Sequence, residues 1–339
     1  MNIRTNAKWT FLVFFAFLIF AACCEATEQQ TENNDIPWYF IAIHNEPFNH
    51  EWNRYFTEES YDILTKMIAK ADSYHIKLTL MFAPSWPDYL LSNKERAAAL
   101  AHWKKNGHEI AGHHHSVGHG NWDGYSNLSR QDALEWRDKV GGHDWESCYG
   151  AETYYGTLTD LTAKLQLINP AVKSGCMNDE GNRKFLPDAI IYDTCSGFVN
   201  YGEVGRVELD IKPEKGRNEY ISVGTYNGIE RKWLTHHFLL YVQAAKDIFN
   251  SMRSGVYGTV NHSAPHELQI FSDYLDFLHK VDPQGRKSRT LSAIIEEKLL
   301  PEKRLSAAQV NVFSPPRHRS PPKPLSPEDC PHVRKQKVL

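Results

Sequence analysis

Residues 107–119 read GHEIAGHHHSVGH, a short apolar segment that runs into three consecutive histidines. An Ala-rich stretch over residues 94–105 predicts a helix that Gly107 ends, and the residues after it predict a strand over 108–113. Gly112 and Gly118 flank the histidines, as glycines do where the backbone bends close to a ligand. The segment therefore indicates a helix followed by a strand that ends in imidazoles.

Strand and helix patterns alternate on both sides of this segment. Further strands are predicted at residues 38–43, 76–82, 172–176, 189–195 and 256–261. Helices are predicted at 129–140 and 153–167, and others begin at Thr57, Thr235 and Pro265. Such alternation indicates parallel strands joined by helical crossovers. We therefore expect an α/β fold in which residues 36–305 form one (β/α) barrel domain.

The composition excludes one class of partner. The 339 residues carry 38 Lys and Arg against 41 Asp and Glu, for a net charge of -3. Nucleic-acid binding needs a basic surplus gathered on one face, so we expect no nucleic-acid partner. Hydrophobic residues make up 41% of the chain, which is enough for a large core.

The N-terminus resembles an export signal. The apolar run from Thr10 to Phe20 is short for a membrane span and predicts a signal over residues 1–23. It leads into FAAC, which resembles a bacterial lipobox, so we expect cleavage before Cys23 and a lipid anchor there. An ordinary secretory cut near Ala22 or Ala26 is the alternative. Both alternatives predict an exported protein, periplasmic or on the outer surface. A lipid at Cys23 is the one membrane contact we expect.

Two segments outside the domain are predicted to lack a core. Residues 24–35 are polar and predict a linker, and residues 306–339, rich in Pro, Lys and Arg, predict a disordered tail.

Within the domain, Cys176 and Cys195 end predicted strands and are the expected disulfide pair, which leaves Cys148 without a partner in this prediction. The chain has no CxxC motif, which argues against a thiolate zinc site.

The ends of three predicted strands carry residues that can bind a metal or take part in catalysis. A parallel barrel presents its site at the carboxyl ends of its strands. The first of these strands leads into His44 and Glu46, the third into the histidine run, and the late strand into His262. His115 and His119 share a side if their segment is helical, whereas His113 and His115 share one if it is extended.

These imidazoles together with Glu46 predict a divalent-metal site. The expected ligands are drawn from one carboxylate and three histidines: Glu46, His113, His115 and His119. Zinc is the first candidate for such a donor set, and cobalt or nickel are the others. A group of surface histidines at a strand end is the alternative.

The GHEIAGH segment with the HSVGH that overlaps its end resembles the metal motif of the polysaccharide deacetylases, the NodB-homology domain of carbohydrate esterase family 4. The family pattern is G-H-E-I-G-x-H followed by H-[S/T]-x-x-H. His44-Asn45-Glu46 stands where some branches have D-x-E, and His262 stands where the family has its last-strand histidine. The resemblance covers residues 36–300 and implies the distorted seven-stranded deacetylase barrel.

The sequence departs from the family pattern at three places. His44 replaces the aspartate that acts as base in the family. Either His113 or His115 aligns as the first histidine ligand, depending on the register. The Arg-Pro motif expected near the middle of the chain is not visible, and residues 174–179 read SGCMND there instead.

The resemblance implies metal-assisted hydrolysis of an amide or ester. A bound metal would lower the pKa of its water toward about 7. His44 is the expected base, with Glu46 in reserve if it is not a ligand, and His262 would protonate the leaving amine. Asp193 is expected to orient a neighbouring His or Arg, with a helix cap or turn as its alternative.

Aromatic residues in the loops after the second and third strands are candidate sugar-binding groups. Trp86, Trp122 and Tyr125 could stack on sugar faces, and Asp123 could bind a hydroxyl or amine. Packing in the core or in a lid is the alternative for each.

We therefore expect a metal-dependent carbohydrate deacetylase acting on a glycan. The alternative is a catalytically impaired deacetylase-like protein that binds glycan or metal without turnover, and His44 decides between the two. A metallohydrolase of the same fold acting on a non-sugar amide is a third possibility.

Overall fold

The computed structural model describes residues 36–46, 54–117, 121–140, 153–178, 186–194, 216–226 and 228–306. The chain divides into two units, Met1–Asp35 and Ile36–Leu339, and everything described here belongs to the second. The predicted signal with Cys23, the linker and the tail beyond Ser306 lie outside the described residues. Within the described ranges, no helix is long and apolar enough to cross a membrane.

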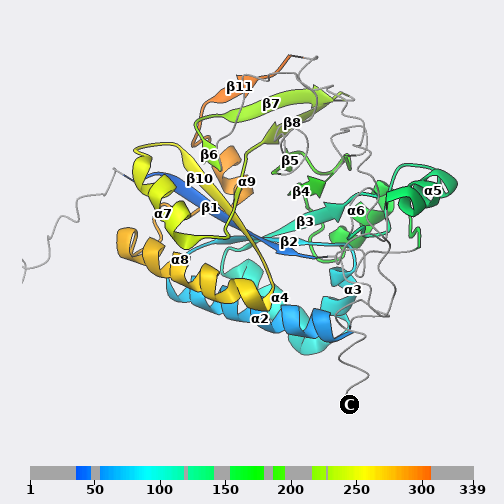
Figure 1. Cartoon of the computed structure of the whole chain (residues 1–339), viewed down its shortest axis with the longest axis horizontal. Helices are drawn as coiled ribbons and strands as arrows, with labels where there is room; N and C mark the ends of the chain where they lie inside the picture. The colour runs from blue at the N-terminus through cyan, green and yellow to red at the C-terminus, as the bar shows by residue number, and fades with distance from the viewer. Residues whose placement is uncertain are drawn as a thin grey trace, which may run out of the picture. The chain divides into compact units, whose positions relative to one another are not determined.

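The core of the second unit is one mixed, strongly curled sheet, a half-barrel with helices around it (Figure 1). The strands from β8 through β10 in its path run parallel, whereas the β7–β8 and β6–β10 pairs are antiparallel. The α/β fold predicted from the sequence is confirmed. In sheet order the strands are β11 (Glu302–Arg304), β7 (Ile221–Tyr226), β8 (Ile229–Trp233), β5 (Tyr192–Asp193), β4 (Ser174–Asn178), β3 (Glu109–His115), β2 (Leu78–Phe82), β1 (Trp38–Asn45), β10 (Val256–His262) and β6 (Arg217–Asn218), and β9 (His237–Phe238) also pairs with β10.

Helices cover the outer face of the parallel strands. Figure 1 shows α2, α4 and α8 together on one side of β1, β2 and β3, and α7 packs against α8. The helices are α2 (Arg54–Ser73), α3 (Trp86–Leu91), α4 (Lys94–Lys105), α5 (Arg130–Val140), α6 (Leu158–Gln166), α7 (Val242–Ser251), α8 (Leu268–Val281) and α9 (Leu291–Glu296), with a 3-10 turn, η3 (Pro265–Glu267), before α8.

Alternate residues of β1 enter two different hydrophobic clusters. Ile41 and Ile43 belong to the cluster that α2 and α8 also enter, whereas Phe40 and Ala42 belong to the cluster on the other face of the sheet. Because side chains alternate along a strand, His44 leaves β1 on the same interior face as Phe40 and Ala42.

The same interior face continues on β3 and β10. Ala111 of β3 and Val260 of β10 lie in the interior cluster, so His113 and His262, each two residues further along, project to the same side. Strand register also aligns His44 with His262 across the β1–β10 pair. The fold therefore gathers imidazoles from three strands over one end of the interior.

Two predicted helix starts are wrong. Thr57 lies inside α2, which begins at Arg54. Thr235 precedes β9 rather than a helix, and α7 begins at Val242. The hydroxyl and amide of Thr235 donate to Asn218 Oδ1 at 3.2 and 2.7 Å, so this residue holds a loop to the β6 strand instead of capping a helix.

Candidate metal centre

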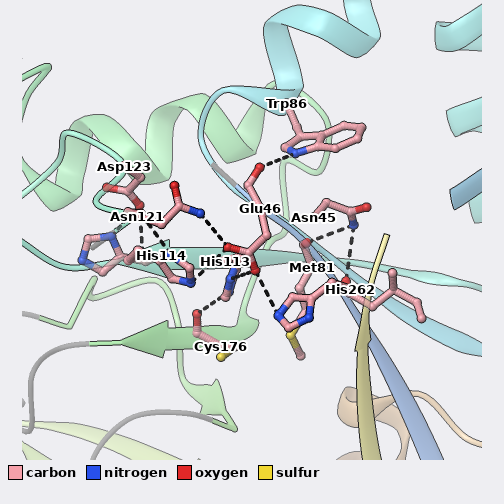
Figure 2. Close-up of polar contacts among 12 residues, drawn as sticks. Asn45, Glu46, Met81, Trp86, His113, His114, Asn121, Asp123, Cys176 and His262 are labelled. Atoms are coloured by element: carbon pink, nitrogen blue, oxygen red, sulfur yellow. Dashed lines mark hydrogen bonds and ion pairs between the residues drawn. The ribbon is translucent and has the colours of Figure 1, made fainter. Parts of the chain in front are cut away.

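The carboxylate of Glu46 lies at the centre of three imidazoles (Figure 2). His113 Nε2 and His262 Nε2 lie 3.3 and 3.2 Å from Glu46 Oε1, and His115 Nε2 lies 3.4 Å from Oε2. Glu46 follows β1 directly, while the histidines come from the ends of β3 and β10. The parallel strands thus bring together residues that the sequence places far apart.

The hydrogen bonds of the two β3 histidines define which nitrogen faces Glu46. His113 Nδ1 lies 3.1 Å from the Cys176 carbonyl oxygen, and His115 Nδ1 lies 3.0 Å from the Asn121 carbonyl oxygen. A carbonyl only accepts, so each ring donates through Nδ1 and, when neutral, keeps a bare lone pair on Nε2. Both Nε2 atoms face the carboxylate of Glu46, and a metal cation between the groups would satisfy this arrangement.

This donor set fits a divalent transition metal. The ligand atoms of Glu46, His113 and His115 all lie within 4.8 Å of one another. Two imidazole nitrogens and one carboxylate oxygen suit zinc, cobalt or nickel, and the Nδ1 hydrogen bonds are of the kind that orient metal-binding histidines. His113 and His115 share this site because β3 is extended through both, which is the extended alternative above. His119, the remaining predicted ligand, lies outside the described residues.

Asn121 fixes two of these groups at once. Its side-chain Nδ2 donates to Glu46 Oε2 at 3.0 Å, while its backbone carbonyl oxygen accepts from His115 Nδ1 at 3.0 Å. Trp86 Nε1 also donates to the backbone oxygen of Glu46 at 2.8 Å. Sequence reasoning missed Asn121, and the only indication available was its position just after the histidine run.

The charges around Glu46 favour its ionised form. Burial raises the pKa of this carboxyl, but His115, His113 and His262 outweigh burial and hold it well below its ordinary value. Glu46 is therefore a carboxylate, which is the form that binds a metal.

His44 lies beside the centre and forms a second cluster of possible ligands, since its ring nitrogen and the ligand atoms of Glu46 and His262 all lie within 4.8 Å of one another. It is 5% exposed, and its ring stacks on that of His113 with centroids 4.2 Å apart and planes at 30°. Burial, reinforced by His113, His262 and His236, lowers its pKa well below the ordinary value, so the ring is neutral. Its Nε2 is buried and has no hydrogen-bond partner among the described residues.

Glu267 holds His262 in place. The His262 Nδ1 lies 2.7 Å from Glu267 Oε1, and the His262 backbone amide donates to Oε2 at 2.7 Å. Glu267 is buried in the turn η3, whereas the His262 side chain is 28% exposed. His262 is thus the histidine of the centre that is open to solvent, with a buried carboxylate behind it. Sequence reasoning missed Glu267, because nothing in its position marks it as a partner of His262.

No family model matches the sequence, and no curated protein matches it either. Among solved structures, the 4-alpha-glucanotransferase of Thermococcus litoralis has a TM-score of 0.47 and 13% identity over 80% of this chain, which spans only 42% of the length of that protein. A protein of Mycobacterium smegmatis described as a polysaccharide deacetylase has a TM-score of 0.45 and 12% identity, over 80% of this chain and 95% of its own. The family 4 acetyl xylan esterase of Clostridium thermocellum, solved with a cobalt ion, has a TM-score of 0.39 and 15% identity, over 78% of this chain and 92% of its own.

The chain is structurally similar, at low identity, to polysaccharide deacetylases.

A third cluster of possible ligands in this deacetylase-like fold gives no metal site. His44 and His113 lie near the Cys176 sulfur, but Cys176 is disulfide-bonded and offers no thiolate. Cys195, its predicted partner, lies outside the described residues, as does Cys148.

Asp193 contacts backbone amides. Its Oδ1 accepts from the amides of Met177 and Thr194 at 3.0 and 2.7 Å, which ties β5 to β4. These contacts fit the turn alternative given above for Asp193. The carboxylate that orients His262 belongs to Glu267.

The predicted sugar-stacking residues are buried. Trp86 and Trp122 are 0% exposed, so neither offers a ring face to a ligand, and Tyr125 is also buried. Trp122 Nε1 donates to the Tyr125 carbonyl oxygen at 2.9 Å. The packing alternative replaces the predicted stacking role for all three.

Asp123 is a structural residue of the loop after β3. Its Oδ2 lies 2.7 Å from His114 Nδ1 and accepts from the His115 amide at 3.1 Å, and its Oδ1 accepts from the Tyr125 amide. Because this carboxylate is buried and bonded to the chain, it fixes the loop and is not placed to bind a sugar, which corrects the prediction for Asp123.

Proposed function

We propose that the protein is a metal-dependent hydrolase that removes acyl groups, with acetyl the first candidate, from an amino sugar or polysaccharide. The observation that carries the proposal is the convergence of His113 Nε2 and His115 Nε2 on the Glu46 carboxylate beside a solvent-accessible His262. It combines a metal site with a proton donor within reach of one substrate position.

Glu46, His113 and His115 would hold the metal, for which zinc is the first candidate. When bound there, the metal would supply Lewis-acid activation of an acyl oxygen and of water. Asn121 keeps Glu46 and His115 in position through its side chain and its carbonyl oxygen.

Two histidines would move the protons. His44 is the candidate base because of its place at the end of β1, but burial lowers its pKa well below the ordinary value and makes the ring a weak base. His262 would give a proton from Nε2 to the leaving amine while Glu267 accepts from Nδ1 and stabilises the charged ring.

The test is metal analysis of the purified full chain, followed by assays of acetate release from a panel of N- and O-acetylated glycans. Bound zinc, and acetate release that a chelator stops and zinc restores, would support the proposal. A protein that holds metal but releases no acetate from any of these substrates would contradict it.

A binding protein without turnover is the second candidate. The observation that favours it is His44, which is buried and stacked on His113 where the base is expected. Metal-dependent glycan binding with no acetate release would establish this function. The binding is measured by calorimetry on the same panel of glycans.

A further inference from the structure

Exposed hydrophobic side chains gather on one segment that runs from the end of β9 to the start of α7. Phe238, Leu240 and Tyr241 are 36, 47 and 74% exposed, and they lie within four consecutive positions. The other exposed large hydrophobic residues of the described chain, Leu91, Tyr155 and Leu167, are separated in the sequence. A group of exposed apolar side chains of this kind marks a binding surface more often than a packing surface.

Phe238 connects this segment to the candidate metal centre. Its ring meets that of His262 with centroids 4.9 Å apart and planes at 71°. His262 in turn lies 3.2 Å from Glu46. Phe238 is therefore an exposed aromatic residue in direct contact with the proposed proton donor.

The backbone holds Phe238 firmly at this position. β9 pairs with β10 so that Phe238 is the partner of Val260, and the Leu239 amide donates to the Val260 carbonyl oxygen at 3.0 Å. His237 Nδ1 lies 2.6 Å from the hydroxyl of Tyr257 in β10. The ring is thus supported by a strand rather than by a free loop, as a binding residue should be.

The chemistry of the neighbouring groups indicates which ligand this ring meets. A pyranose presents C–H groups on its faces, and a flat aromatic side chain in contact with solvent can pack against such a face. Any amine that receives a proton from His262 must lie within hydrogen-bond distance of that ring. The sugar that bears the amine then lies beside Phe238.

We propose that Phe238 is the sugar-stacking residue of the site and holds the pyranose that carries the acylated amine beside His262. This inference rests on the proposed function and adds the residue that binds the sugar ring through its apolar face. It assigns to Phe238 the role that Trp86, Trp122 and Tyr125 cannot fill because they are buried.

The experiment compares Phe238→Ala and Phe238→Trp with the wild-type full chain. Leu167→Ala is the matched control, since Leu167 is an exposed apolar residue, 55% accessible, at the end of α6. Binding of the N-acetylglucosamine tetramer is measured by calorimetry. Acetate release is measured with the tetramer and with ethyl acetate, which has no ring to stack.

Phe238→Ala should weaken binding of the tetramer about tenfold, the size expected for one ring contact. Phe238→Trp and Leu167→Ala should keep wild-type affinity, and Phe238→Ala should lose more activity on the tetramer than on ethyl acetate. Unchanged tetramer affinity in Phe238→Ala, or no tetramer binding by the wild type, would overturn the inference, as would an equal loss on ethyl acetate. Phe238-dependent binding without any acetate release would support the role of Phe238 while contradicting the proposed function.

Discussion

The carboxylate of Glu267 binds both the Nδ1 and the backbone amide of His262, each at 2.7 Å, from a buried position in the turn η3. One group therefore fixes the orientation of the ring and of the strand end that carries it. It also places a buried carboxylate oxygen beside Nδ1, while Nε2 of the same ring lies 3.2 Å from Glu46.

Glu267→Gln should lower kcat for acetate release about 10- to 100-fold, the usual effect of losing a partner that orients a histidine. The metal content and KM should change little, because Glu267 is not placed among the ligands. Glu297→Gln, at an exposed glutamate paired with Arg289, is the control and should behave as wild type. If substrate affinity, metal content and melting temperature all fell together with kcat, Glu267 would act only in folding.

His262→Ala should lower turnover by about 10²- to 10⁴-fold while metal affinity is retained. The loss should be larger for an acetamide than for an activated aryl ester, whose leaving group needs little protonation. Kinetics on both substrates, with zinc measured in the same samples, test this. Equal losses on the two substrates, or loss of zinc, would show that His262 is a ligand or a packing residue.

Asn121→Ala should weaken zinc binding about tenfold, because Glu46 loses the side-chain amide that donates to its Oε2, whereas His115 keeps the backbone carbonyl oxygen of residue 121. Zinc affinity is measured by competition with a chromophoric chelator. Asn93→Ala is an informative comparison, since Asn93 caps α4 by accepting from two backbone amides and has no contact with the centre. That variant should lose stability of about 1 kcal/mol but bind zinc normally. Similar zinc affinities for wild type and Asn121→Ala would refute the positioning role.

His108 should make the fold less stable in acid. Its Nδ1 accepts from the Leu78 amide at 3.0 Å, which requires an unprotonated nitrogen, and burial lowers its pKa although Asp72 opposes this. The unfolded chain therefore binds the proton more readily, so the stabilisation is complete above the unfolded pKa of about 6.5 and is lost as the pH falls below it.

Urea unfolding of wild type and His108→Ala at pH 7.5 and pH 5 tests this prediction. The stability difference between the two proteins should be larger at pH 7.5. A difference that is constant with pH would mean that His108 contributes only by packing.

Cys23→Ser should release the protein from the membrane fraction of the producing cell if Cys23 carries a lipid. Cys24→Ser is the matched control and should leave the partitioning unchanged. An unaltered distribution of the Cys23 variant would favour the ordinary secretory signal.

The sequence predicted those features that depend on local pattern. The helix at residues 94–105 has the predicted bounds, and Asn93 and Gly107 explain why, since one caps the helix and the other adopts a positive φ of 87° after it. The alternation of β3 likewise predicted that His113 and His115 share a face if the segment is extended. By contrast, the β7–β8 hairpin was missed although Asn227-Gly228, a common hairpin pair, stands between its strands.

Features that depend on tertiary contacts could not be predicted in this way. Glu267 and Asn121 carry no local pattern that names His262 or Glu46 as their partners. The tryptophans were assigned to a surface because they lie in loops, whereas the structure buries them completely. Hydrophobicity alone does not distinguish an aromatic ring that packs in the core from one that is exposed, so Phe238, which is 36% exposed, was overlooked.

The alternation along β3 limits which changes of length the chain can tolerate. His113 and His115 face the interior, while His114 bonds to Asp123 on the opposite side. Deleting or inserting one residue between Ile110 and His113 would turn the strand over. A single imidazole would then face Glu46, two would face outward, and Asp123 would lose the ring it binds. Gains and losses of single residues should therefore be confined to the loops around this strand, whereas conservative substitutions within it leave the ligand geometry in place.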